Sequence, residues 1–159
     1  MWPWRNYLKS SILVSKDDLS TALGKFSPGR ETSFRDKAYT VTGEKSLVGL
    51  VERHSRVFRF KYGGNKRAGS DGDDSYPDCD DFAFMECADI NRAAILSGFK
   101  APPAYGRIWY RTVRGGWHEA CFGFVLPLRF CLHDPLSGRW CFDGEAEKEI
   151  AEAIEFNIP

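Results

Sequence analysis

Three side chains in this sequence have the types that thiol chemistry requires: Cys79, His118 and Asp134. Cysteine attacks as a thiolate, and a helix N-terminus together with an imidazolium favours that charged form. A base must lie within hydrogen-bond reach of the sulfur, and a third group must orient the base. We therefore take Cys79 as the nucleophile, His118 as the base and Asp134 as the carboxylate that holds the imidazole.

The nucleophile depends on a helix. Asp78 is a suitable N-cap, and Gly98 is suited to follow the last helical turn. Between them, apolar residues recur at the spacing of one helix face, namely Ala83, Cys87, Ile90 and Ala94. This pattern predicts a helix with Cys79 in its first turn.

The base and its carboxylate depend on a hairpin. If the strands around Leu126 pair symmetrically, His118 lies directly opposite Asp134 on the same face of the sheet. His133 is out of phase with Asp134 and is expected on the other face. We interpret His133 and His54 as ordinary residues.

Negative charge surrounds the proposed nucleophile and opposes a thiolate. Two explanations stay open. Asp78 caps the helix while Asp80 and Asp81 sit favourably in its first turn, or a hard cation such as calcium is held by Asp80 or Asp81 with Asp73 or its neighbours in the preceding loop. That loop is not an EF-hand, because Phe82 stands where the twelfth-position glutamate would be.

The remaining parts of the site are assigned by position. The backbone N–H of Cys79 is the default stabiliser of an oxyanion, and the Tyr76 hydroxyl is an alternative donor. Trp117 adjoins His118 and could wall a substrate groove or simply pack.

Composition indicates one globular domain spanning residues 1–159, with 43% hydrophobic and 28% charged residues. The 22 basic and 22 acidic residues cancel, so net charge does not indicate nucleic acid as a partner. No apolar run reaches the roughly 18 residues of a membrane span. We expect a cytoplasmic protein with no membrane partner, and the composition leaves its oligomeric state unknown.

Five cysteines, without a C-x-x-C pair, argue against a disulfide framework and favour a reducing compartment. We interpret the four cysteines other than Cys79 as small buried hydrophobes. A structural zinc site is a minor alternative, built from a histidine with Cys121, Cys131 and Cys141.

The pattern along the chain predicts an α+β fold. Residues 1–62 form a helical flank, with helices from Ser15 and from about Thr42 and a strand over 57–62; residues 63–77 form a loop. Four antiparallel strands are expected over 107–113, 117–125, 128–133 and 139–142, followed by a helix over 146–154.

Three blocks of sequence carry a family resemblance: Asp-Cys-Asp-Asp-Phe-Ala at 78–83, Trp-His-Glu-Ala at 117–120, and His-Asp-Pro at 133–135 with Gly138. They resemble the active-site blocks of papain-like and transglutaminase-like cysteine peptidases, and most closely the peptidase domain of a mushroom (Marasmius-type) agglutinin and its bacterial and viral relatives. The resemblance covers about residues 76–142. This chain has Asp134 where the agglutinin-type domain has a glutamate.

The resemblance implies a papain-like fold in which the nucleophile helix packs on a four-stranded antiparallel sheet. It implies a thiol protease or amidase that cleaves a peptide or other amide bond through a Cys79–His118–Asp134 triad and a thioester. This chemistry requires no cofactor, and the resemblance leaves open a dependence on calcium or a similar divalent cation. A transglutaminase or deamidase would use the same residues. The rival hypothesis is a catalytically silent papain-like module that engages or inhibits a macromolecular partner.

Overall fold

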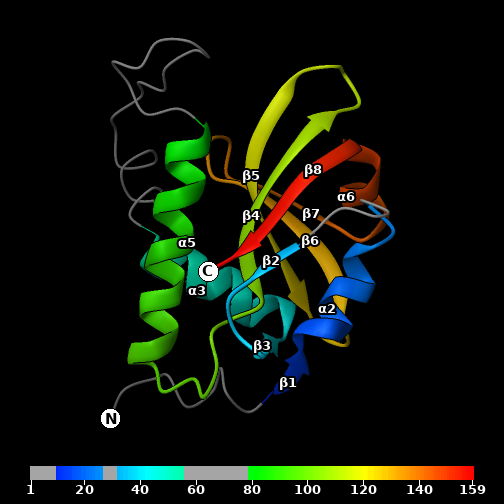
Figure 1. The fold of residues 1–159 in the computed structure, drawn as a ribbon. Helices are drawn as coiled ribbons and strands as arrows, with labels where there is room; N and C mark the ends of the chain where they lie inside the picture. The colour runs from blue at the N-terminus through cyan, green and yellow to red at the C-terminus, as the bar shows by residue number, and fades with distance from the viewer. Residues whose placement is uncertain (1–9, 27–31, 56–78) are drawn as a thin grey trace.

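The protein is described here from a computed structural model, which describes residues 10–26, 32–55 and 79–159. One mixed sheet dominates it, with helices on both faces (Figure 1). The elements in chain order are β1 (Ser11–Ser15), α2 (Lys16–Leu23), β2 (Thr32–Phe34), β3 (Ala38–Thr42), α3 (Glu44–His54), α5 (Cys79–Leu96), β4 (Tyr105–Thr112), β5 (Trp117–Val125), β6 (Arg129–Asp134), β7 (Arg139–Phe142), α6 (Gly144–Glu149) and β8 (Ile150–Ile158).

The sheet has eight strands in the order β1-β3-β5-β4-β8-β2, and β6 and β7 extend it from β5. Most neighbouring strands are antiparallel, but β2 runs parallel to β8 and β3 runs parallel to β5. The strands β4, β5, β6 and β7 pair in sequence as an antiparallel meander. The hairpin that carries His118 therefore lies inside a larger sheet.

Each face of the sheet has its own core. On one face, Leu19 and Leu23 of α2 pack with a cluster of phenylalanines, among them Phe122, Phe130 and Phe156. On the other face, α3 and α5 pack through apolar side chains that include Leu47, Leu50, Ala83 and Ile90. Figure 1 shows α2 and α5 on opposite sides of the strands.

Local signals fixed the helix ends as expected. The Ser15 side chain accepts a hydrogen bond from the Asp18 backbone N–H at 3.1 Å, which caps α2. Gly98 follows α5 with a φ of +81°, and the Phe99 N–H bonds to the Ala94 carbonyl at 3.1 Å. A positive φ at this position suits glycine, so the helix ends there.

The expected fold class is wrong in its sheet and in its N-terminal flank. The sheet has eight strands and is mixed, where four antiparallel strands on a papain-like plan were expected. Within residues 1–62, α2 and α3 are present, but β1, β2 and β3 lie there too. The run Tyr39 to Thr42 is buried between β1 and β5 and so lacks the alternation that marks a half-exposed strand. The predicted strand over 57–62, the loop over 63–77 and the Asp78 cap lie outside the described residues.

The expected C-terminal helix is also wrong beyond Glu149. Residues 150–158 form β8, which pairs with β4 on one side and β2 on the other. Two register shifts in the β4–β8 ladder place buried residues at Ala153, Phe156 and Ile158. A bulge inserts an extra residue into a strand, so Ala153 and Phe156 fall three residues apart, a spacing that one face of a helix also has.

A buried carboxylate joins α5 to the sheet. Glu86 is 0% exposed, and its oxygens accept from Ser55 Oγ at 2.8 Å, Tyr105 OH at 2.5 Å and His133 Nδ1 at 2.6 Å. The His133 ring also stacks on Trp140 at 4.3 Å between centroids. Burial, with the nearby Cys121 and Glu86, raises the pKa of Tyr105 far above its usual value, so its hydroxyl remains a donor. The network therefore ties one turn of α5 to β4 and β6.

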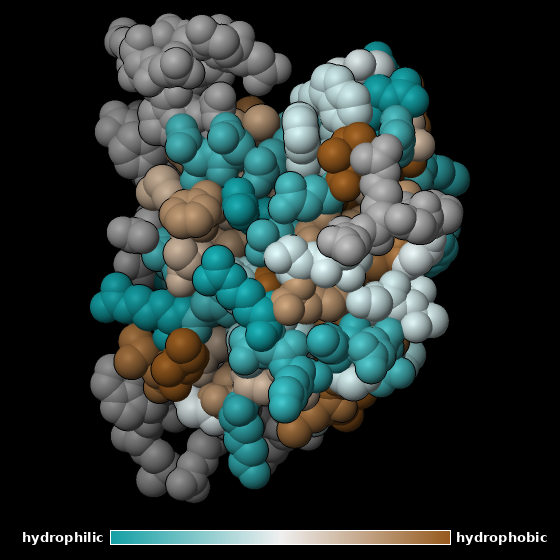
Figure 2. All heavy atoms as spheres, viewed as in Figure 1, coloured by the Kyte–Doolittle hydropathy of each residue, from teal (hydrophilic) through white to brown (hydrophobic). Residues whose placement is uncertain are grey.

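The outer face of α5 is partly apolar, with Phe84, Ile95 and Leu96 more than half exposed. Figure 2 shows these apolar areas as separate patches among polar side chains, one of them where α5 ends. Within the described residues, none of the helices combines the length and the apolarity that a membrane crossing requires.

We expect Glu86→Ala to lower the free energy of unfolding by about 3–5 kcal/mol, because three buried partners lose their acceptor. Glu86→Gln should cost less, since its amide oxygen still accepts. Urea unfolding followed by tryptophan fluorescence measures both. Arg92→Ala, an exposed change on the same helix, is the control and should stay within about 0.5 kcal/mol of the wild type. A loss below 1 kcal/mol for Glu86→Ala would contradict this role.

Candidate functional site

Cys79 is the first residue of α5 and is partly exposed. The first four N–H groups of a helix lack partners within it, so the sulfur stands at the positive end of the helix dipole. The other four cysteines are buried, each with at most 4% of its surface exposed. Cys79 is thus the one thiol with ready access to solvent among the five, all of which are described.

The hairpin register differs from the expected one by two residues. Phe124 pairs with Phe130, whereas symmetry about Leu126 would pair it with Leu128. The same register puts Ala120 level with Asp134, so His118 is a diagonal neighbour of Asp134 rather than its direct partner. A shift of two preserves the face on which a side chain lies, and diagonal neighbours remain within reach of long side chains.

The structure brings the three expected residues together. His118 Nε2 lies 3.4 Å from Asp134 Oδ1, and the Cys79 side chain is near enough to the imidazole to raise its pKa. Because Nε2 lies towards Asp134, Nδ1 is the ring nitrogen left for the sulfur. Tyr110, directly opposite His118 on β4, meets the imidazole ring edge-on at 5.8 Å between centroids. The ring is held from three sides.

Asp134 is oriented by the turn that it begins. Its Oδ1 accepts from the Leu136 backbone N–H at 2.9 Å and its Oδ2 accepts from Ser137 Oγ at 2.5 Å. Gly138, with a φ of +74°, donates its N–H to the Asp134 carbonyl at 2.7 Å. Aspartate commonly bonds to the backbone two residues ahead in this way. The turn therefore fixes the carboxylate that faces His118.

The two ionisable groups stabilise each other's charge. Hydrogen bonds to Asp134 and then to Cys79 raise the pKa of His118 to about 10, against the opposing effect of burial. Burial raises the pKa of Asp134, but hydrogen bonds from His118, Ser137 and the Leu136 N–H outweigh it and lower that pKa to about 2. At neutral pH the site therefore holds an imidazolium and a carboxylate.

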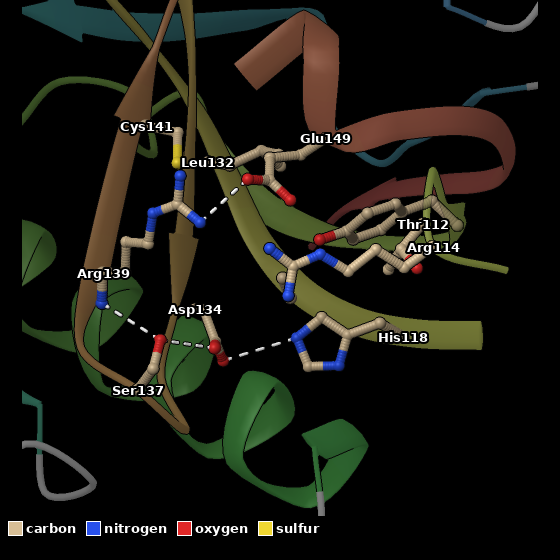
Figure 3. A pocket seen from close by; sticks show the side chains of 11 residues that line it. Thr112, Arg114, His118, Leu132, Asp134, Ser137, Arg139, Cys141 and Glu149 are labelled. Atoms are coloured by element: carbon tan, nitrogen blue, oxygen red, sulfur yellow. Dashed lines mark hydrogen bonds and ion pairs between the residues drawn. The ribbon is translucent and has the colours of Figure 1, made fainter. Parts of the chain in front are cut away.

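A cavity of about 240 Å³ opens beside this pair. We call it the His118 pocket (Figure 3). Apolar side chains and polar or charged ones share its lining, which consists of Tyr110, Thr112, Arg114, His118, Ala120, Leu132, Asp134, Ser137, Arg139, Cys141 and Glu149. Arg139 and Glu149 form an ion pair at 2.8 Å. Burial and the nearby Asp134 raise the pKa of Tyr110, so its hydroxyl is neutral.

Trp117 does not share the face of His118. Its ring packs against Trp109 at 5.6 Å between centroids, and each of the two side chains is 47% exposed. A smaller polar cavity of about 60 Å³ adjoins Trp109 and is lined also by Arg107, Glu119, Glu155 and Asn157. Consecutive residues of a strand point to opposite faces of the sheet. Trp117 and His118 are consecutive in β5, so their side chains lie on opposite faces.

The expected metal ligands are only partly visible. Asp80 and Asp81 are exposed in the first turn of α5, while Asp73 and Tyr76 lie outside the described residues. Among the residues that the structure describes, no three histidine, cysteine or acidic side chains gather as a metal site. Calcium stays a prediction. The zinc alternative is wrong, since Cys141 lies in the core opposite to that of Cys121 and Cys131.

Sequence reasoning missed the other members of the site. Tyr110 was detectable, because it pairs with His118 across the β4–β5 hairpin. Arg114 lies in the loop of that hairpin, and Glu149 comes from the end of α6, which no sequence pattern connects with His118. His133 was treated as ordinary, yet it lies in the buried network around Glu86.

No family model and no curated protein matches the chain. Among solved structures, its fold is similar to one half of a lectin chain. The first is a complex of PSL1a with E64, at 16% identity and a TM-score of 0.66; it is matched over 90% of this chain and 49% of that one. The second is Polyporus squamosus lectin bound to the human-type influenza-binding epitope Neu5Aca2-6Galb1-4GlcNAc, at 12% identity and a TM-score of 0.64, with 91% and 49% covered.

These comparisons correct the family and the function expected from sequence. Neither neighbour is named as a peptidase, so the recognition as a papain-like or transglutaminase-like cysteine peptidase is replaced by a fold likeness to half of a lectin. The enzyme assignment falls with it, including the hydrolase, cysteine protease and catalytic-triad descriptions. Of the rival hypothesis, the papain-like fold and the macromolecular partner fall too, while a binding module in general is left standing. The expected peptide or protein substrate is contradicted as well, because the two neighbouring structures are complexes with E64 and with a sialylated epitope. Three residues in order predict a geometry; they do not by themselves fix a reaction.

We expect the His118–Asp134 interaction to make stability depend on pH. The pKa of His118 is about 10 when folded and near 6.5 when unfolded, so its contribution is full below about pH 6.5 and is lost as pH rises through 10. The contribution of Asp134 is present above about pH 3.8 and is lost as pH falls through 2. Urea unfolding from pH 5.5 to 10 should show the gap between wild type and Asp134→Asn narrowing at high pH.

Asp143→Asn is the matched control for this measurement. Asp143 pairs with Arg129 at 2.9 Å, and arginine keeps its charge over this range. Its stability difference from wild type should therefore stay constant from pH 5.5 to 10. If the stability difference between Asp134→Asn and the wild type is equally constant from pH 5.5 to 10, the raised pKa of His118 is contradicted.

Proposed function

We propose that this domain is a ligand-binding module whose site carries an activated thiol at Cys79. The observation that supports the proposal is the position of the His118 ring, which pairs with the Asp134 carboxylate at 3.4 Å and whose pKa the nearby Cys79 side chain raises. His118 supplies positive charge beside the sulfur, and Asp134 keeps that charge in place. The helix N-terminus adds to the same electrostatic effect.

The chemistry proposed is formation of one thioether with an electrophilic ligand. The PSL1a structure is a complex with E64. An epoxide is the simplest electrophile for which the proposed step can be written. In such a reaction the Cys79 thiolate forms a bond to a ring carbon, the C–O bond at that carbon breaks, and the His118 proton moves to the alkoxide. No oxidant or reductant is required, and the proposal concerns a stoichiometric adduct.

A reducing, cytoplasmic location is part of the same proposal, because the thiol must stay free. None of the five cysteines forms a disulfide, and the sulfurs of Cys87 and Cys121 lie 3.7 Å apart as a hydrogen-bonded pair of thiols. Disulfides are rare in such compartments.

We expect one adduct per chain, at Cys79, when the protein is treated with iodoacetamide or E64 at pH 6. Free cysteine is only about 0.3% thiolate at that pH, so activation should make Cys79 at least about tenfold faster than free cysteine. Intact-mass spectrometry and peptide mapping measure the rate and the position. The four buried thiols serve as internal controls.

Variants separate activation from mere exposure. Cys79→Ala should remove the adduct, His118→Asn should lower the rate at pH 6 at least tenfold, and Asp143→Asn should leave it unchanged. Each rate is measured with calcium and with a chelator, since a cation at Asp80 and Asp81 would offset the negative charge near the sulfur. Labelling of Cys79→Ala at the wild-type rate, or a wild-type rate no faster than that of free cysteine, would refute the proposal.

Glycan binding is a second candidate, supported by the exposed pair of tryptophans and by the sialylated ligand of the Polyporus squamosus lectin. The C–H face of a sugar ring can stack on an indole, while its hydroxyls bond to nearby polar side chains. Trp109 adjoins a small cavity with Arg107, Glu119, Glu155 and Asn157, which offers both kinds of contact.

We expect Neu5Acα2-6Galβ1-4GlcNAc to perturb the indole N–H signals of Trp109 and Trp117 in an NMR titration. Trp109→Ala should weaken binding at least fivefold, because one stacking surface is lost. Leu96→Ala, which removes an exposed apolar side chain from the end of α5, is the control and should bind as the wild type does. If the Trp117 signal of Trp109→Ala still shifts as strongly as in the wild type, glycan binding at Trp109 is excluded.

A further inference from the structure

The His118 pocket contains one cationic side chain that its carboxylates do not neutralise. Its two carboxylates are both engaged: Asp134 faces His118, and Glu149 pairs with Arg139 at 2.8 Å. His118 is protonated at neutral pH because Asp134 raises its pKa to about 10. Both carboxylates of the lining are thus engaged, and Arg114 is the cation of the lining that neither of them pairs with.

Arg114 comes from the loop between β4 and β5 and lines the pocket. Figure 3 shows its side chain extending into the pocket, between the His118 ring and the Arg139–Glu149 pair. Within residues 10–26, 32–55 and 79–159, no carboxylate forms an ion pair with it. Its guanidinium therefore directs several hydrogen-bond donors into a hollow.

The rest of the lining indicates the kind of anion that fits. Ala120 and Leu132 are buried apolar residues, and Tyr110 presents a neutral ring beside them. A cavity of about 240 Å³ holds only a small group. One unpaired guanidinium matches one negative charge, and its planar fork matches the two oxygens of a carboxylate. The combination suits a carboxylate on a short apolar stem.

We propose that the His118 pocket is a subsite for a carboxylate of the ligand, in which Arg114 binds the anion and the apolar floor holds its stem. This inference rests on the proposed function, because it names the ligand group that lies next to the thiol of Cys79. Arg114 selects the ligand by charge, since a neutral amide of the same shape would leave the guanidinium unpaired.

Butyrate and butyramide test the subsite, because they match in shape and differ in charge. Each is titrated into the full chain while the ring signals of His118 are followed by NMR at pH 7. We expect saturable shifts with butyrate and at least roughly fivefold weaker binding of butyramide, which corresponds to one ion pair of about 1 kcal/mol. Arg114→Gln should abolish the difference between the two probes, and Arg114→Lys should restore part of it.

Arg111→Gln is the matched control. Arg111 lies on β4, is similarly exposed, and pairs with Glu152 at 3.7 Å outside the pocket, so this variant should keep the wild-type preference. Equal binding of the two probes to wild type, or a preference for butyrate that survives in Arg114→Gln, would overturn the subsite.

The same samples are labelled with iodoacetamide, which separates the two proposals. Butyrate binding that depends on Arg114, combined with an unreactive Cys79, overturns the thiol proposal and leaves the anion subsite standing. A reactive Cys79 without selective butyrate binding overturns the subsite alone.

Discussion

The arrangement of this protein depends on one buried carboxylate. Glu86 lies at the interface between α5 and the sheet, where it accepts hydrogen bonds from Ser55, Tyr105 and His133. An apolar interface alone would tolerate small rotations or slips of the helix, because hydrophobic attraction has no direction. Hydrogen bonds to a single buried group fix both the rotation of α5 and its height on the sheet, and a slip would leave that group unsatisfied. The helix therefore has one position, and so does Cys79 at its start.

The second half of the site is fixed in a different way. Asp134 begins a tight turn and is held by that turn's own backbone, while His118 reaches it diagonally across the hairpin. Sulfur, imidazole and carboxylate thus come from three segments, each stabilised by contacts that do not require a ligand. Pre-organisation of this kind limits the entropy lost when a ligand binds. Around them, the pocket adds residues from β4, its following loop and the end of α6.

Sequence predicted the local parts of this structure better than the global ones. The Ser15 cap, the glycine after α5 and the meander from β4 to β7 follow from signals within a few residues. The predicted register of the hairpin was wrong by two residues. His118 and Asp134 still lie close together, because a shift of two residues keeps each side chain on the same face of the sheet. The strands β1 to β3 and β8 were missed, since their partners are distant and bulges or double-sided burial hide their period. No pattern in the nearby sequence predicts the partners of Glu86 or the position of Arg114. Residue spacing also could not predict the likeness to a lectin fold.

The position of β8 has a consequence for how the chain folds. This strand lies between β4 and β2, and it aligns Thr32 with Phe156. Contacts this far apart in sequence carry a large loop-closure entropy and slow the folding of a domain. During synthesis, β2 and the edge of β4 that pairs with β8 remain unpaired until residues 150–158 have left the ribosome. The sheet is consequently completed only after translation of this segment, and until then its open edges are the part of the nascent chain most exposed to aggregation.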